Sequence, residues 1–214
     1  MHIVGFTLFI LSLLLLSGGA VAATDGADYK NLQKQWAVAK YQTPEDQREE
    51  AFKALADESA RVVEANPDSA ETLIWRAIVL STYAGEKGGL GALSLVKEAK
   101  ALLEQAEQLD AEALQGSIYT SLGSLYYQVP GWPIGFGDDD KALEYLQKAL
   151  DINPDGMDAN YFYGDFLIEE GEYAEAVKVL EKAIQAPARA ERPLADQGRK
   201  TEIKLALDKA RKEL

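Results

Sequence analysis

Apolar residues recur every three or four positions along most of this chain, which is the spacing of one face of an α-helix. Tyr29, Leu32, Trp36 and Ala39 form the first such stripe. No stretch has the strict apolar–polar alternation that is typical of a half-buried strand. The pattern therefore predicts an all-α chain, with helices at 27–41, 45–64, 68–84, 93–108, 111–128, 138–152, 158–170, 173–186 and 194–214.

Small and large apolar residues follow one spacing in two of these regions. The shared order is Gly123, Tyr126, Ala142, Leu146, Ala149 and Pro154 in one, and Gly164, Leu167, Ala176, Leu180, Ala183 and Pro187 in the other. The first copy has seven extra residues between its glycine and its first alanine, and the segment 130–136 accounts for them. A more degraded copy reads Ala77, Leu80, Ala99, Leu103 and Ala106, with a surplus of ten that the glycine-rich segment 85–91 absorbs.

This spacing has a physical interpretation. Small residues such as Gly123 and Ala142 allow two helices to approach closely, and large residues such as Leu146 fill the space between them. Pro154 ends a helix, because proline lacks a backbone donor and restricts the residue before it. Each unit is therefore a helical hairpin that must stack on its neighbours to bury its apolar face. The expected fold is a stack of antiparallel helical hairpins with two insertions between helices, at 85–91 and 130–136.

The stretches 122–126, 141–149, 163–167 and 173–183 resemble the tetratricopeptide repeat. The resemblance implies one helical-repeat domain over 23–214, an α-solenoid whose best repeats are 116–154 and 157–187. The helix at 194–214 is then expected to cap the last repeat, because an end repeat needs a solvated outer face.

The first 22 residues predict a secretory signal peptide. An apolar run at 3–16 is followed by Ser-Gly-Gly and then by Ala20, Val21 and Ala22, which form a small-x-small cleavage signal. Cleavage after Ala22 predicts a periplasmic or secreted protein, with no membrane insertion of the mature chain. The net charge of −13 predicts that nucleic acid repels the protein.

The residues available for chemistry argue against an enzyme. The chain has no cysteine, and its single histidine is His2, within the predicted signal peptide. Histidine- and cysteine-based catalysis and zinc binding are thus excluded from the mature chain. We expect no catalytic residues, no metal site and no cofactor. The acidic run 138–140 is explained as a helix start, where the helix dipole favours negative charge, rather than as an ion site.

The repeat resemblance implies a non-enzymatic module for protein–protein interaction or scaffolding, with a protein or peptide partner in a concave groove. The groove is lined by the first helix of each repeat, where a peptide or a partner helix can lie. By that analogy, the candidate partner-binding positions are Ile74, Ile78, Ser117, Thr120, Ser124, Tyr127, Asp158, Tyr161, Asp165 and Ile168.

The insert at 130–136 offers a second candidate contact, through Trp132, Ile134 and Phe136. These side chains either project as a docking patch or fold back onto the core.

An alternative function is a small-molecule-binding accessory. The chain has a looser similarity to the repeat-built T component of tripartite solute transporters. That similarity implies a cavity for a small apolar or aromatic ligand, enclosed here by Tyr126, Tyr127, Trp132, Phe136, Tyr161 and Tyr163. A closed aromatic cavity would favour this function, and a long open groove would favour protein binding.

Overall fold

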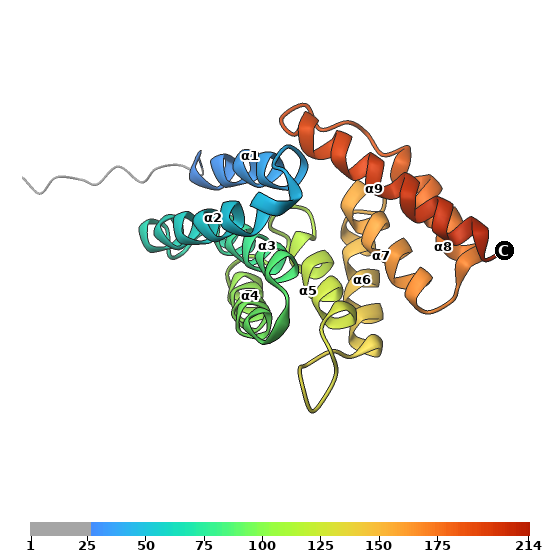
Figure 1. Ribbon diagram of the computed structural model, residues 1–214, viewed down its shortest axis with the longest axis horizontal. Coiled ribbons are helices and arrows are strands. Elements are labelled where there is room, and N and C mark those ends of the chain that lie inside the picture. The colour runs from blue at the N-terminus through green and yellow to red at the C-terminus, as the bar shows by residue number, and fades with distance from the viewer. Residues whose placement is uncertain (1–26) are drawn as a thin grey trace, which may run out of the picture.

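The computed structural model describes residues 27–214, and this part of the chain contains nine α-helices and no strand (Figure 1). The predicted all-α fold is confirmed. The predicted signal peptide and its cleavage site lie outside the described residues. The helices are α1 (Ala27–Tyr41), α2 (Glu45–Ala65), α3 (Ala70–Lys87), α4 (Gly89–Leu109), α5 (Ser117–Gln128), α6 (Asp139–Ile152), α7 (Met157–Glu169), α8 (Tyr173–Ile184) and α9 (Pro193–Lys212).

Local sequence sets where the helices begin. The hydroxyl of Ser69 accepts a hydrogen bond from the backbone N–H of Thr72 at 3.3 Å and starts α3. The carboxylate of Asp138 does the same for the N–H of Lys141 at 3.1 Å and starts α6. Both contacts satisfy a backbone donor that the first helical turn leaves free. The acidic run 138–140 is therefore a helix start.

Close packing at two glycines holds the repeat hairpins together. A Cβ atom added to Gly123 would lie 2.6 Å from Cγ of Leu146, and one added to Gly164 would lie 2.6 Å from Cγ of Leu180. Both leucines are fully buried. Hairpins α5–α6 and α7–α8 thus pack with no space for a side chain at either glycine, which confirms the predicted pairing of small and large residues.

The nine described helices form an inner and an outer set. Each even-numbered helix contacts only odd-numbered helices, so α2, α4, α6 and α8 lie on the outside. The odd-numbered helices contact one another in order, from α1 to α3, α5, α7 and α9. In addition, α9 contacts α1, from the opposite end of the chain, and Figure 1 shows the two brought together. The inner helices therefore form a closed ring of contacts.

The surplus residues at 85–91 do not form a loop between helices. Instead α3 continues to Lys87 and α4 begins at Gly89, so that the extra length is added to both helices. The chain turns sharply at Gly88 and Gly89, each with a φ of 62°. These left-handed conformations favour glycine, which is why so short a turn is possible here.

Helix α5 begins later than its apolar pattern predicts. The pattern continues from residue 111, but Leu114, Gln115 and Gly116 have φ values of 51°, 54° and 80°. Three consecutive residues with positive φ interrupt a right-handed helix. The segment 111–116 therefore forms turns, and α5 starts at Ser117.

The glycine packing gives a stability prediction. Gly123→Ala is expected to lower the free energy of unfolding by about 1–3 kcal/mol, because the new methyl group overpacks a filled core. Gly85→Ala is the matched control, since that glycine lies in α3 with no atom within 4 Å of an added Cβ. The free energy of unfolding of the control should rise by about 0.5–1 kcal/mol, because alanine has the higher helix propensity.

Urea denaturation of both variants measures this difference. Equal stabilities of the two variants would show that the hairpin does not depend on close approach at Gly123.

Candidate functional site

A cavity of about 430 Å³ lies inside the ring of odd-numbered helices. Each of these five helices contributes residues to the cavity wall, and Arg192, which directly precedes α9, completes the wall. The lining residues are Trp36, Lys40, Trp75, Ile78, Ser81, Thr82, Gly85, Glu86, Ser117, Thr120, Ser121, Ser124, Gln128, Asp158, Tyr161, Phe162, Arg192, Arg199 and Glu202. Residues far apart in the sequence thus share one concave surface.

Aromatic rings cover two parts of this wall. Trp36 of α1 and Trp75 of α3 meet edge to face, with ring centres 6.2 Å apart. Tyr161 and Phe162 of α7 meet in the same manner at 5.1 Å. The indole N–H of Trp36 donates to the hydroxyl of Thr82 at 2.9 Å, which fixes the ring. Such rigid rings are suited to packing against the apolar part of a ligand.

Hydroxyl groups line the α3 and α5 side of the cavity. Those of Ser81 and Thr82 donate to backbone carbonyls of α3, each at 2.8 Å. Those of Ser117, Thr120 and Ser124 donate to carbonyls at or near the start of α5, at 2.8, 3.3 and 3.0 Å. Because the hydroxyl protons are engaged in these bonds, the oxygens are left as acceptors.

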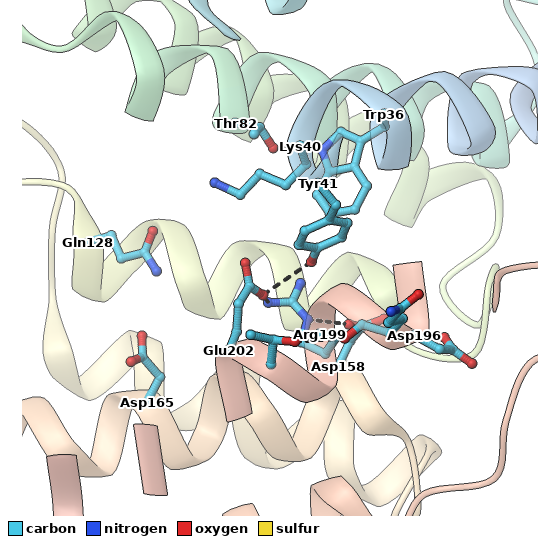
Figure 2. Close-up of polar contacts among 12 residues, drawn as sticks. Trp36, Lys40, Tyr41, Thr82, Gln128, Asp158, Asp165, Asp196, Arg199 and Glu202 are labelled. Carbon is cyan, nitrogen blue, oxygen red and sulfur yellow. Dashed lines mark hydrogen bonds and ion pairs between the residues drawn. The ribbon is translucent and has the colours of Figure 1, made fainter. Parts of the chain in front are cut away.

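A cluster of charged residues joins α7 to α9 (Figure 2). Asp158 of α7 accepts a hydrogen bond from Nη1 of Arg189 at 2.6 Å and another from Nε of Arg199 at 2.8 Å. Asp196 accepts from Nε of Arg189 at 2.7 Å, and Glu202 accepts from Nη1 of Arg199 at 2.6 Å. Charges that leave water need such partners, because an unpaired buried charge is strongly unfavourable.

The pKa values reflect this arrangement. Burial alone would raise the pKa of Asp158, but the guanidinium groups of Arg199 and Arg189 outweigh it and hold the pKa well below its usual range. Burial opposes the charge of Arg199 as well, and Asp158 and Glu202 more than compensate, so that its pKa is raised. Tyr161 has its pKa raised to about 12, mainly by burial. Asp158 and Arg199 therefore stay ionised at neutral pH.

The cluster continues across the ring to α1. The hydroxyl of Tyr41 donates to Oε2 of Glu202 at 3.2 Å, which Figure 2 shows beside Arg199. A Cβ on Gly198 would lie 2.4 Å from the Tyr41 ring, so α9 lies directly against that ring. Lys40 extends the polar side of α1 by donating to Glu86 at 3.2 Å. These contacts close the ring between the first and last described helices.

The predicted groove positions divide into three groups. The cavity wall includes Ile78, Ser117, Thr120, Ser124, Asp158 and Tyr161. Tyr127 and Asp165 bond to each other at 2.7 Å and join α5 to α7. Ile74 and Ile168 are 0% and 3% exposed and belong to the hydrophobic core, not to the groove surface. A helix face turned toward its neighbours buries its apolar residues first, which explains this difference.

The large apolar side chains of the insert at 130–136 are either exposed or packed on the helices. Trp132 is 90% exposed and Ile134 is 62% exposed. Phe136 instead packs edge to face on Tyr126 with ring centres 5.5 Å apart. Of the six aromatic residues expected to enclose a ligand, only Tyr161 lines the cavity, and Trp36, Trp75 and Phe162 take the place of the others.

Sequence reasoning missed the arginines and Glu202 as part of the wall. Helical spacing places Arg192 in the connection before the last helix, and Arg199 and Glu202 in a capping helix. Spacing along one helix carries no information about which distant helix it contacts. The available signal is the three arginines at 189, 192 and 199, an unusual density of positive charge in an acidic chain.

Two further findings concern residues 27–214. None of their helices combines the length and the apolar character needed to cross a bilayer. No group of three or more acidic or histidine side chains converges as metal ligands in this part of the chain.

Comparison with known proteins identifies a repeat. A family model described as "Tetratricopeptide repeat" matches residues 134–193, which contain α6, α7 and α8. No curated protein matches the chain.

Several solved structures are similar. One is the crystal structure of MamA, at 21% identity and a TM-score of 0.44, covering 78% of this chain and 92% of that one. A thermophilic TPR protein of Thermus thermophilus has 18% identity, a TM-score of 0.41 and coverages of 83% and 99%. YrrB, described as a TPR protein with an unusual peptide-binding site, has 18% identity, a TM-score of 0.42 and coverages of 87% and 92%.

The charged cluster gives a prediction for Asp158. Asp158→Asn is expected to lower the free energy of unfolding at pH 7 by about 2 kcal/mol, because it leaves the buried guanidinium of Arg199 and the half-buried one of Arg189 without their carboxylate. Asp155→Asn is the control, since its carboxylate is 76% exposed and pairs only with Lys182. The control should change stability by less than about 1 kcal/mol.

The same pair predicts a pH dependence. A carboxylate with a lowered folded-state pKa stabilises the fold above its unfolded pKa of about 3.9, and this contribution is lost as the pH falls below that value. The difference in the free energy of unfolding between wild type and Asp158→Asn, measured by urea denaturation, should therefore become smaller below about pH 4. A constant gap from pH 7 to pH 3 would contradict the assigned role of Asp158.

The insert gives a second stability prediction. Trp132→Ala should change the free energy of unfolding by less than about 0.5 kcal/mol, because the side chain is exposed. Phe136→Ala should lower it by about 2 kcal/mol, since the ring packs on Tyr126. Thermal denaturation, monitored by circular dichroism, distinguishes the two variants. A large loss of stability in Trp132→Ala would show that Trp132 supports the fold.

Proposed function

We propose that the protein is a non-enzymatic interaction or scaffolding module of the bacterial periplasm, because residues 134–193 match the tetratricopeptide repeat model. Its binding surface is the cavity inside the ring, and its partner is a protein that inserts an extended segment. The observation that carries this proposal is the composition of the wall, in which rows of acceptor oxygens on α3 and α5 face aromatic rings on α1, α3 and α7.

An extended segment matches this wall in two ways. Its free backbone N–H groups need acceptors, and the serine and threonine oxygens supply them. Its side chains need apolar surface, and Trp36 and Phe162 supply that. Periplasmic location follows from the predicted signal peptide at 1–22 and is part of the proposal.

A small-molecule-binding accessory is the second candidate. The contact between α1 and α9 favours it, because the cavity inside the ring, of about 430 Å³, lies in the range of small-ligand pockets, roughly 300–1,000 Å³. A short peptide segment and a small ligand use the same wall, so the size of the bound species separates the two functions.

A cavity-filling variant tests the proposal. Ser121→Trp places a large side chain in the cavity wall and should abolish capture of a partner from a periplasmic extract. Ser94→Trp is the matched control, because Ser94 is exposed on the outer helix α4 and should leave capture unchanged. The measurement is mass spectrometry of proteins retained by each immobilised variant.

Three outcomes are informative. Loss of one partner with Ser121→Trp alone supports the proposal. Equal retention by both variants would show that the partner contacts another surface, and Trp132→Ala then tests the insert. A small molecule found by native mass spectrometry in wild type but not in Ser121→Trp, with no retained protein, would favour the second candidate.

A further inference from the structure

Two buried N–H groups on residues that line the cavity have no hydrogen-bond partner. They are Nε1 of Trp75 and Nε of Arg192, the buried side-chain polar atoms left unsatisfied in residues 27–214. Trp75 is only 3% exposed, and Cζ of Arg192 lies 5.1 Å from its ring centre. An unsatisfied buried donor is unfavourable, and two of them on residues that line one cavity indicate a place for an acceptor.

Arg192 is also the least compensated charge of the cluster. The carboxylate of Asp158 already accepts from Arg189 and Arg199, and it lies 3.7 Å from Nη1 of Arg192. Asp196 and Glu202 form their short contacts with Arg189 and Arg199. Burial lowers the pKa of Arg192, and the attraction of Asp158 does not fully offset burial and repulsion by the other arginines. A further anion beside Arg192 would relieve this imbalance.

The surroundings select the kind of anion. A planar carboxylate matches the fork of a guanidinium group and can also accept from an indole N–H. A doubly charged phosphate would face the carboxylates of Glu86, Asp158 and Glu202 in the same cavity. Lys40, which could offset them, is engaged with Glu86. A single negative charge therefore fits better than two.

We propose that the cavity binds a carboxylate-bearing ligand, with the carboxylate between Arg192 and the indole N–H of Trp75 and an apolar body against the aromatic rings. The carboxylate belongs either to a free organic acid or to the end of a peptide chain. This inference rests on the proposed function, in which the cavity is the binding surface.

Calorimetric titration of the purified protein tests it, with phenylacetate and its neutral counterpart phenylacetamide as probes. Phenylacetate should bind at least about tenfold more tightly, which corresponds to about 1.4 kcal/mol. Arg192→Met keeps the apolar stem and should remove this preference, while Arg192→Lys keeps the charge and should retain part of it. Equal affinity for both probes, or no binding of phenylacetate at about ten millimolar, would overturn the proposal.

A second, more conservative variant tests the site with little risk of misfolding. Trp75→Phe keeps a ring and removes only the N–H donor, so it should weaken phenylacetate binding several-fold and leave phenylacetamide unaffected. Far-UV circular dichroism and melting confirm that each variant is folded. An unchanged preference in folded Trp75→Phe and Arg192→Met proteins would place the carboxylate elsewhere and sink the proposal.

The source of the carboxylate is distinguished by a tripeptide, Ala-Ala-Phe, with a free or an amidated end. Preference for the free-acid peptide over phenylacetate identifies a chain end, and the reverse identifies a free organic acid. Partner capture separates this inference from the proposed function. If Ser121→Trp loses the partner while wild type shows no carboxylate preference, only the carboxylate site fails.

Discussion

The half-buried carboxylate of Asp158 is the constraint on which the shape of the protein depends. It lies on α7 and holds two arginines that flank or belong to α9, so it fixes the direction in which α9 leaves the last repeat. Arg199 in turn holds Glu202, which accepts from Tyr41 of α1. Replacing such a buried set by apolar residues is often neutral for stability, so its value here lies in specifying one position for α9. That position closes the ring.

Two kinds of interaction therefore determine different parts of the fold. Contacts between a glycine and a leucine, as at Gly164 and Leu180, set each hairpin and join residues close together in the sequence. The contact between Gly198 and Tyr41 joins opposite ends of the described chain. Repeat packing alone extends a stack without limit. The charged cluster and the Tyr41 contact close the repeating stack into a ring, and the candidate binding cavity lies inside that ring.

This division explains how much of the molecule could be predicted from the sequence. The hairpins at Gly123 and Gly164 were predictable because their spacing is local and periodic. The helical face that points into the ring was predicted correctly for Ser117 and Tyr161, but Ile74 and Ile168, expected on the same surface, are buried in the core. The closure of the ring was not predictable, because the spacing of residues within α1 and within α9 does not indicate that the two helices contact each other. The cavity wall formed by α9 was missed for the same reason.

Closure also limits what can reach the wall. The ring of five helices around about 430 Å³ leaves room for a chain segment or a small molecule, and not for a folded domain. The wall offers both acceptors, in the hydroxyl oxygens on α5, and donors, in Trp75 and Arg192. In the proposed carboxylate site, the acceptors of the ligand would point toward Arg192. Any folded partner has to contact the outer surface instead, where Trp132 is the most exposed aromatic side chain of the described residues.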